Sequence, residues 1–247
     1  MDIKNTSVLR YKVKRIFFTG LVCVLLGGLV FAQQTKPWND WSRKDADKML
    51  NDSAWGQTLK KGETPPDMSN RNGGSGSQGS GVQGPAPLPS VVYFRVRLIT
   101  AKPIREGFAS KLLLSQPNQT DEVRRELQTI IDNGFGDFIV VAVNVDGQNP
   151  QTVGMAFQEL MRLKAATLAA KVYLERKDGK RLPLIDYKPP VADNMGGKFV
   201  FARSLDGVPF LAPDSDSVRF VLDMSGNLKL NVKFKVSSMM YGDKLEY

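Results

Sequence analysis

The fold is decided by the stretch SVRFVLDMSGNLKLNVKFKV, residues 217–236. Alternate residues of its first half, Val218, Phe220 and Leu222, share one face of a strand. After the turn at 225–227, a second run alternates in the same way: Leu228, Leu230, Val232, Phe234 and Val236. Such a pattern is typical of a β-hairpin with one buried face and one solvated face. The pattern therefore predicts a one-sided antiparallel sheet covered by helices.

Further strands are expected upstream of this hairpin. Residues 171–176 and 181–187 flank Lys177-Asp178-Gly179-Lys180, and an Asp-Gly pair is a strong hairpin signal. Residues 91–100 alternate as a strand, and 198–203 form a short one. Residues 137–145, DFIVVAVNV, are almost continuously apolar, which indicates a strand buried on both faces.

Three helical patterns lie between these strands. Pro103 opens the first, which runs to Leu114. Thr120 is the expected N-cap of the second, which ends at Asn133-Gly134. Asn149 caps the third, with Pro150 at its first position and helical spacing that continues to Leu168. The predicted class is α+β: a mostly antiparallel sheet with two to three helices packed on one face, plus a short tethered N-terminal helix.

Residues 1–32 have the three parts of a bacterial-type secretory signal. A basic region ends at Lys14-Arg15, an apolar run spans 16–31, and Val30-Phe31-Ala32 offers a cleavage site after Ala32. The alternative is an uncleaved anchor, but the apolar run is shorter than the roughly 20 residues that span a bilayer. We expect an exported protein, periplasmic or extracellular, with no stable membrane span after cleavage.

The rest of the chain divides into three regions by composition. Residues 33–69 are polar and contain one short helical pattern, and 70–89 are rich in Gly, Ser and Pro. Gly/Ser-rich segments behave as flexible coil, so 70–89 is expected to be a linker. Residues 90–247 carry nearly all of the periodicity, and we expect them to form the globular domain.

Composition excludes several chemistries. The sequence has no His, and its single Cys, Cys23, lies in the signal segment. Disulfides, thiol catalysis, Ser-His-Asp triads and nearly every zinc site are therefore excluded from the mature chain. The formal net charge of +9 is partly due to the signal segment, and the remaining excess is spread along the chain. A nucleic-acid binder concentrates its charge on one face, so no nucleic acid is expected.

No catalytic residue, metal ligand or cofactor site is predicted. Asp214-Ser215-Asp216 and Asn144-Val145-Asp146-Gly147 each resemble part of a calcium loop, but neither has the downstream Glu. The residue preferences of turns account for both.

The last strand has a cationic face, formed by Lys229, Asn231, Lys233 and Lys235. This face could bind an anionic surface, but we expect it to be the solvent-exposed side of the sheet.

The segment Lys102-Pro103-Ile104-Arg105-Glu106 stands where a strand gives way to a helix. A basic pair beside a helix N-terminus could hold an anion. The simpler interpretation is chain punctuation by Pro103, with Arg105 and Glu106 solvated, and this is the one we favour.

All three Trp residues lie close together, at Trp38, Trp41 and Trp55. Between them, Ser42-Arg43-Lys44-Asp45 resembles a capping box, and Ala46, Met49 and Leu50 form an apolar stripe of about two turns. A helix this short is not stable alone in water, so it must dock on something. It docks either on its own domain or on a partner protein. In the second case the binding residues would be Trp38, Trp41, Met49, Leu50 and Trp55.

The same segment carries a family resemblance. Trp38-Asn39-Asp40-Trp41-Ser42-Arg43-Lys44-Asp45-Ala46, followed by Met49-Leu50-Asn51-Asp52-Ser53-Ala54-Trp55, resembles the opening of a family of uncharacterised exported bacterial proteins. Residues 100–106, 232–236 and 242–247 are similar to other parts of that family. The resemblance implies export and architecture, and no catalytic residues.

These observations favour a non-catalytic binding or assembly module. The alternative is a carboxylate-dependent hydrolase acting on envelope glycans, which needs two facing carboxylates in a cleft of 90–247. A third class is a structural role within a larger envelope complex.

Overall fold

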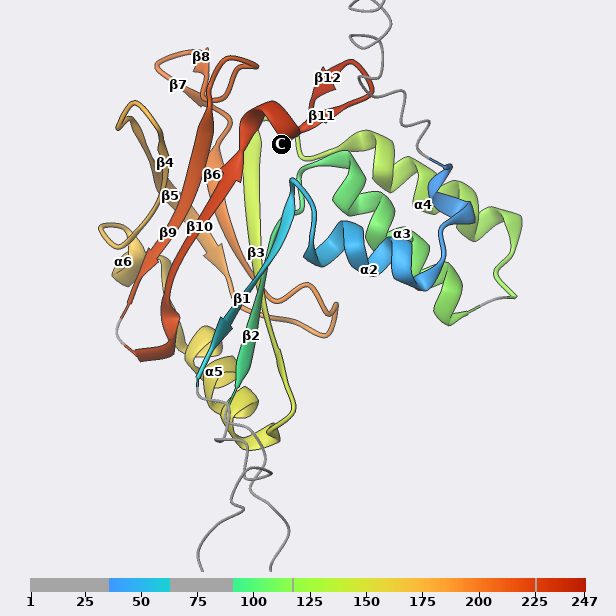
Figure 1. Ribbon diagram of the computed structural model, residues 1–247, viewed down its shortest axis with the longest axis horizontal. Coiled ribbons are helices and arrows are strands. Elements are labelled where there is room, and N and C mark those ends of the chain that lie inside the picture. The colour runs from blue at the N-terminus through green and yellow to red at the C-terminus, as the bar shows by residue number, and fades with distance from the viewer. Residues whose placement is uncertain (1–35, 63–90, 117, 225) are drawn as a thin grey trace, which may run out of the picture. The chain divides into compact units, whose positions relative to one another are not determined.

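The computed structural model describes residues 36–62, 91–116, 118–224 and 226–247, and Trp38–Tyr247 form one compact unit (Figure 1). Its helices are η1 (Trp38–Asp40), α2 (Arg43–Asn51), α3 (Lys102–Ser115), α4 (Asp121–Asn133), α5 (Pro150–Arg162), α6 (Ala165–Leu168), η3 (Gly226–Leu228) and η4 (Val236–Ser238). The strands of its main sheet are β1 (Gly56–Lys61), β2 (Val92–Leu98), β3 (Phe138–Gly147), β4 (Val172–Arg176), β5 (Arg181–Lys188), β6 (Gly197–Ala202), β9 (Ser217–Asp223) and β10 (Lys229–Lys235). Two short ribbons pair β7 (Ser204–Leu205) with β8 (Val208–Pro209) and β11 (Met240–Tyr241) with β12 (Lys244–Leu245).

The main sheet is antiparallel throughout, in the order β1-β2-β3-β6-β5-β4-β9-β10. It curls so far that its two edge strands approach each other (Figure 1). Side chains of β1 bridge the gap: Gln57 Nε2 donates to the carbonyl of Lys233 at 2.7 Å, and Lys61 Nζ donates to that of Lys229. Polar side chains of β1 thus occupy backbone carbonyls of β10 that would otherwise be open to another strand.

The core lies on the concave side of the curled sheet. Phe199 packs against Phe220 with ring centroids 5.3 Å apart, and Phe201 meets the same ring at 6.3 Å. Phe94, from β2 next to the edge strand β1, and Phe234, from the edge strand β10, are also fully buried. The alternation in 217–236 predicted this result, because Val218, Phe220, Leu222, Leu230, Val232 and Phe234 all point inward.

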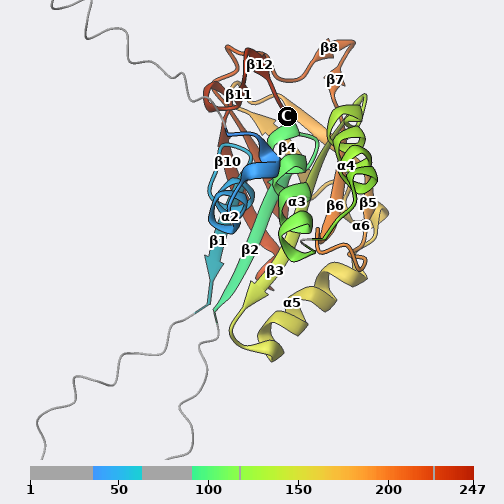
Figure 2. The same ribbon diagram turned by 90° about the vertical axis from the view of Figure 1, so that its right-hand side faces the viewer.

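The helices occupy two places on this sheet. Figure 2 shows α2, α3 and α4 side by side outside the β1–β3 part of the sheet, with α5 apart from them. Ala156 and Leu160 of α5 are buried, and Tyr187 Oη donates to the carbonyl of Leu160 at 2.7 Å. Burial raises the pKa of Tyr187 well above its usual range. The α+β class, with a large antiparallel sheet and helices on its face, is confirmed.

Capping residues visible in the sequence correctly predicted both ends of α4 and the start of α5. Thr120 Oγ1 accepts from the backbone N–H of Val123, and Gly134 follows α4 with φ of 62°. Asn149 Oδ1 accepts from the N–H groups of Gln151 and Thr152 at the start of α5. The expectation of one helix up to Leu168 was wrong, because α5 ends at Arg162 and the chain restarts as α6.

Strand β1 is the main element that the sequence did not predict. It follows α2 directly, and all six of its residues pair with β2. The segment 38–61 therefore docks on its own domain, which was one of the two alternatives for the Trp-rich helix. The expected signal segment 1–32 and the expected linker 70–89 lie outside the described residues. Across the part of the chain that is described, no helix combines the length and apolar character needed to cross a membrane.

Candidate ligand cleft

A cleft of about 1510 Å3 lies over the outer face of β2 and β3. Helices α2, α3 and α4 form one side of it, and the loop at Asp193–Met195 lies on the other. Its basic lining residues are Arg43, Lys44, Lys48, Arg95, Arg97, Arg105 and Lys111, against acidic Asp47, Asp52, Asp146 and Asp193. The lining is therefore cationic on balance, with apolar side chains between the charges.

The floor of the cleft follows from the alternation of β2. Val92, Phe94, Val96 and Leu98 point into the core, so Arg95 and Arg97 point to the outer face. Asn144 of β3 lies opposite Arg95 in the register. Two guanidinium groups and an amide thus stand on the same side of neighbouring strands, where the helices do not fully cover them.

Arg97 is a buried arginine, with 6% of its surface exposed. Its Nε donates to the carbonyl of Leu50 at 2.9 Å, its Nη2 donates to Asn51 Oδ1 at 2.7 Å, and its guanidinium lies 5.4 Å from the ring centroid of Phe108. Among the described residues, no carboxylate comes within ion-pair distance of it. Burial, and then the charge of Arg95, lower the pKa of Arg97 to about 10. The guanidinium is therefore a buried cation whose direct contacts are neutral acceptors and an aromatic ring, while the charges of Asp47 and Asp146 act on it from beyond ion-pair distance.

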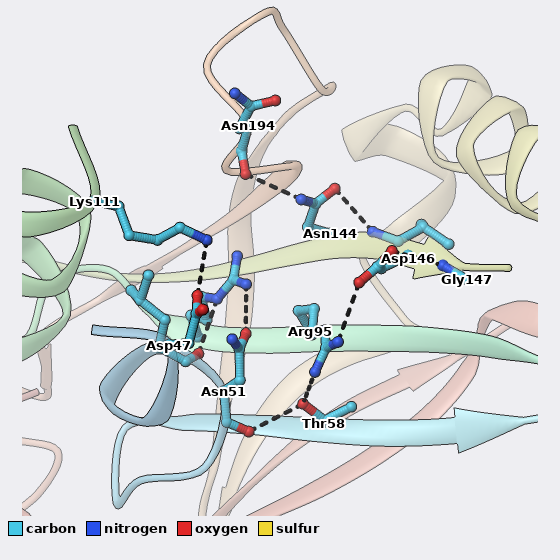
Figure 3. Close-up of polar contacts among 12 residues, drawn as sticks. Asp47, Asn51, Thr58, Arg95, Lys111, Asn144, Asp146, Gly147 and Asn194 are labelled. Carbon is cyan, nitrogen blue, oxygen red and sulfur yellow. Dashed lines mark hydrogen bonds and ion pairs between the residues drawn. The ribbon is translucent and has the colours of Figure 1, made fainter. Parts of the chain in front are cut away.

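Arg95, two residues before Arg97 on β2, is more exposed, with 24% of its side-chain surface open to solvent, and Figure 3 shows it between Thr58 and Asp146. Its Nη1 donates to Thr58 Oγ1 at 2.8 Å, and its Nη2 forms an ion pair with Asp146 at 3.1 Å. Thr58 in turn donates to the carbonyl of Asn51. Strand β1 and the end of α2 thus hold both arginines in place through neutral groups.

The walls carry further polar links. Lys111 of α3 and Asp47 of α2 form an ion pair at 2.9 Å, which ties the two helices together at the rim. Across the cleft, Asn144 Nδ2 donates to the carbonyl of Asn194 at 3.0 Å, as Figure 3 shows. Asp193 is held by Lys198 at 2.6 Å. Three of the four acidic lining residues, Asp47, Asp146 and Asp193, are therefore engaged by basic side chains.

An apolar surface continues from the arginines along α3 and α4. Leu112, Leu127, Ile130 and Phe135 line the same cleft. Ile130 is 63% exposed and Leu112 is 40% exposed, although both are large aliphatic side chains. The cleft therefore combines cationic and apolar recognition on one continuous surface.

The five residues predicted to bind a partner lie in and around α2. Trp41, Leu50 and Trp55 are buried, while Met49 and Trp38 are half-buried. Trp55 Nε1 donates to the carbonyl of Glu246 at 2.7 Å, and Trp38 Nε1 donates to Gln128 Oε1 at 2.9 Å. These contacts are all within the chain, and of the five residues Leu50 alone lines the cleft.

The expectation that Arg105 and Glu106 are solvated was wrong. Arg105 donates to the carbonyls of Thr100 and Ile131, and Glu106 is buried with Tyr241 Oη donating to it. Burial raises the pKa of Glu106 and lowers that of Arg105. Both groups hold α3 against its neighbours, which a local sequence pattern does not reveal. The Lys face of β10, in contrast, is exposed as expected.

The principal residues of the cleft, Arg95 and Arg97, were not singled out from the sequence. Their alternation with apolar residues was visible, but it is also the pattern of an ordinary solvated strand face. Only the packing of α2 and α3 above them turns this face into a cleft.

Comparison with known proteins adds no family. No protein-family model matches the chain, and no curated protein matches it. A crystal structure described as that of a novel protein of unknown function from Burkholderia pseudomallei is similar to part of it. That protein is 10% identical, with a TM-score of 0.37 over 57% of this chain and 72% of the other.

Proposed function

We propose that the mature chain is an exported, non-catalytic binding module, periplasmic or extracellular, whose cleft binds an anionic group of its ligand or partner. The observation that carries this proposal is Arg97, a buried guanidinium without an ion pair among the described carboxylates, next to Arg95. A carboxylate or phosphate in the cleft would place a negative charge in direct contact with Arg97 through charge-assisted hydrogen bonds.

The alternative of a glycan hydrolase stays a prediction with less support. A glycosidase needs two carboxylates that face each other across the bond to be cleaved. In the cleft, Asp47, Asp146 and Asp193 instead sit beside Lys111, Arg95 and Lys198. Each of these carboxylates is thus paired with a basic side chain rather than with a second carboxylate.

Citrate titrated into the purified mature protein by isothermal calorimetry tests anion binding. We expect saturable binding that weakens as salt is raised, because the attraction between charges is screened. Arg95→Gln should weaken it about tenfold, the effect of losing one charged contact of about 1.4 kcal/mol. Arg124→Gln, on the exposed surface of α4 outside the cleft, is the matched control. Equal affinities for the two variants would refute a ligand site at this cleft.

Export and cleavage of the signal segment are tested in a separate experiment, by the location and the first residue of the product. The full chain, expressed in a bacterium with an outer membrane, should yield a product outside the cytoplasm whose first residue is Gln33, as read by mass spectrometry. An intact product that stays with the membrane fraction would support the uncleaved anchor instead.

A further inference from the structure

The apolar wall of the cleft is not explained by anion binding alone. Leu112, Ile130 and Phe135 keep 40%, 63% and 39% of their surface exposed, and all three line the cleft. Large apolar side chains gathered on one surface mark interaction sites more often than isolated ones do. The occupant must therefore carry apolar groups beside its negative charge.

The cations of the cleft are spread over its length. Arg43, Lys44 and Lys48 lie on the exposed side of α2, and none of them forms an ion pair with a described carboxylate. Arg95 and Arg97 lie below them on the floor. An amphiphile with a single anionic head could engage one of these positions, whereas a chain with several carboxylates could engage them together. The distribution of charge thus favours an acidic polypeptide over a lipid.

Size and spacing support the same occupant. The cleft exceeds the roughly 300–1,000 Å3 of usual small-molecule sites. Arg95 and Arg97 are alternate residues of one strand, so their Cα atoms lie about 6.6–6.8 Å apart. Alternate side chains of an extended peptide have that same spacing. From these features, we infer that the occupant is an extended acidic segment of another protein, with apolar side chains that pack on Leu112 and Ile130.

This inference rests on the proposed function, because the acidic side chains would use the same arginines. Three decapeptides, acetylated and amidated at their ends, separate the contribution of negative charge from that of apolar side chains. Their sequences alternate Glu with Leu, Glu with Ser, and Lys with Leu. Calorimetry with the mature protein should show the Glu/Leu peptide binding about tenfold more tightly than Glu/Ser, as expected from burying one aliphatic side chain. The Lys/Leu peptide should not bind.

Two variants locate the apolar contribution. Ile130→Ser should remove the tenfold advantage of Glu/Leu over Glu/Ser. Val208→Ser should leave it intact, because Val208 is 63% exposed like Ile130 but lies on β8 outside the cleft. Both side chains are largely in solvent, so both variants are expected to fold, and circular dichroism checks this.

The other outcomes are distinguishable. If Glu/Leu and Glu/Ser bind equally, or if Ile130→Ser changes nothing, the acidic-apolar segment is overturned while anion binding stands. If oleate binds more tightly than Glu/Leu and loses affinity in Ile130→Ser, the occupant is an amphiphile and the peptide inference fails. If no anionic probe responds to Arg95→Gln, the proposed function itself fails.

Discussion

Glu106 is a carboxyl group that the fold buries on α3, with Tyr241 Oη as its hydrogen-bond donor. Burial raises its pKa from the ordinary value of 4.5, in spite of the nearby Lys102 and Arg105. The folded state therefore holds this proton more tightly than the unfolded state does. The stabilisation is complete below the unfolded pKa, and it is lost as the pH rises through the raised folded pKa.

Glu106→Gln should remove this pH dependence, since an amide of the same shape carries no charge. Urea unfolding at about pH 4 and about pH 7.5 measures it. The variant should gain stability relative to the wild type at the higher pH. Glu126→Gln, exposed on α4, is the control. A wild-type-minus-variant difference in unfolding free energy that is the same at both pH values would contradict the assignment.

Arg97 is a second buried charge, but its role in stability is opposite. Arg97→Met relieves the desolvation of the guanidinium, yet it leaves the carbonyl of Leu50 and the amide oxygen of Asn51 without their donor. Orphaned buried acceptors cost about 1–3 kcal/mol, so we expect a net loss of that size in urea unfolding. Arg95→Gln should cost less than about 1 kcal/mol, because its partner Asp146 is largely exposed. Equal losses in the two variants would mean that Arg97 does not anchor α2.

At the scale of elements, replacing two glycines by alanine should change the stability of the fold in opposite directions. A Cβ on Gly56 would come within 2.3 Å of the carbonyl oxygen of Leu50, where β1 passes under the end of α2. Gly56→Ala should therefore cost about 1–3 kcal/mol, as overpacking does. Gly154 lies inside α5, and apart from its chain neighbours and the nearby backbone of that helix no atom lies within 4 Å of an added Cβ. Gly154→Ala should stabilise by about 0.5–1 kcal/mol through helix propensity. Thermal unfolding of both variants measures these changes in stability. A Gly56→Ala protein as stable as the wild type would contradict the close approach of β1 to the end of α2.

Elements differ in how far the sequence predicts them. The ends of α4 and α5 depend on caps at Thr120 and Asn149, which act within a few residues and are therefore visible in the sequence. Strand β1, GQTLKK, has no clear alternation, and it is a strand because β2 offers it a partner along its whole length. The cleft has the same origin. Arg95 and Arg97 are local, but α2 and α3 reach them only through tertiary packing.

At the scale of the whole molecule, the N-terminal segment is a structural part of the domain. The N–H of Leu98 donates to the carbonyl of Trp55 at 2.8 Å, and the ring of Trp55 meets that of Tyr241 edge-on at 5.9 Å. A protease cut between residues 62 and 91 should therefore leave the two pieces associated. Tryptophan emission should stay blue-shifted, because Trp41 and Trp55 are buried. Red-shifted emission with separation on gel filtration would show that the segment only rests on the domain.

A protein expressed without the N-terminal segment is a stricter test of whether the fold needs that segment than a protein cut after folding. A chain that begins at residue 90 lacks Trp41, Leu50 and Trp55, and the acceptors of Arg97 disappear with α2. Each lost core side chain costs about 2–5 kcal/mol, so the loss of three costs about 6–15 kcal/mol, which is as large as the usual stability of a domain. We expect loss of near-ultraviolet circular dichroism and aggregation. Adding residues 36–62 as a synthetic peptide should restore the fold, since a missing edge strand and helix can bind without a covalent link. A truncated chain that folds cooperatively unaided would instead free the segment to serve a partner.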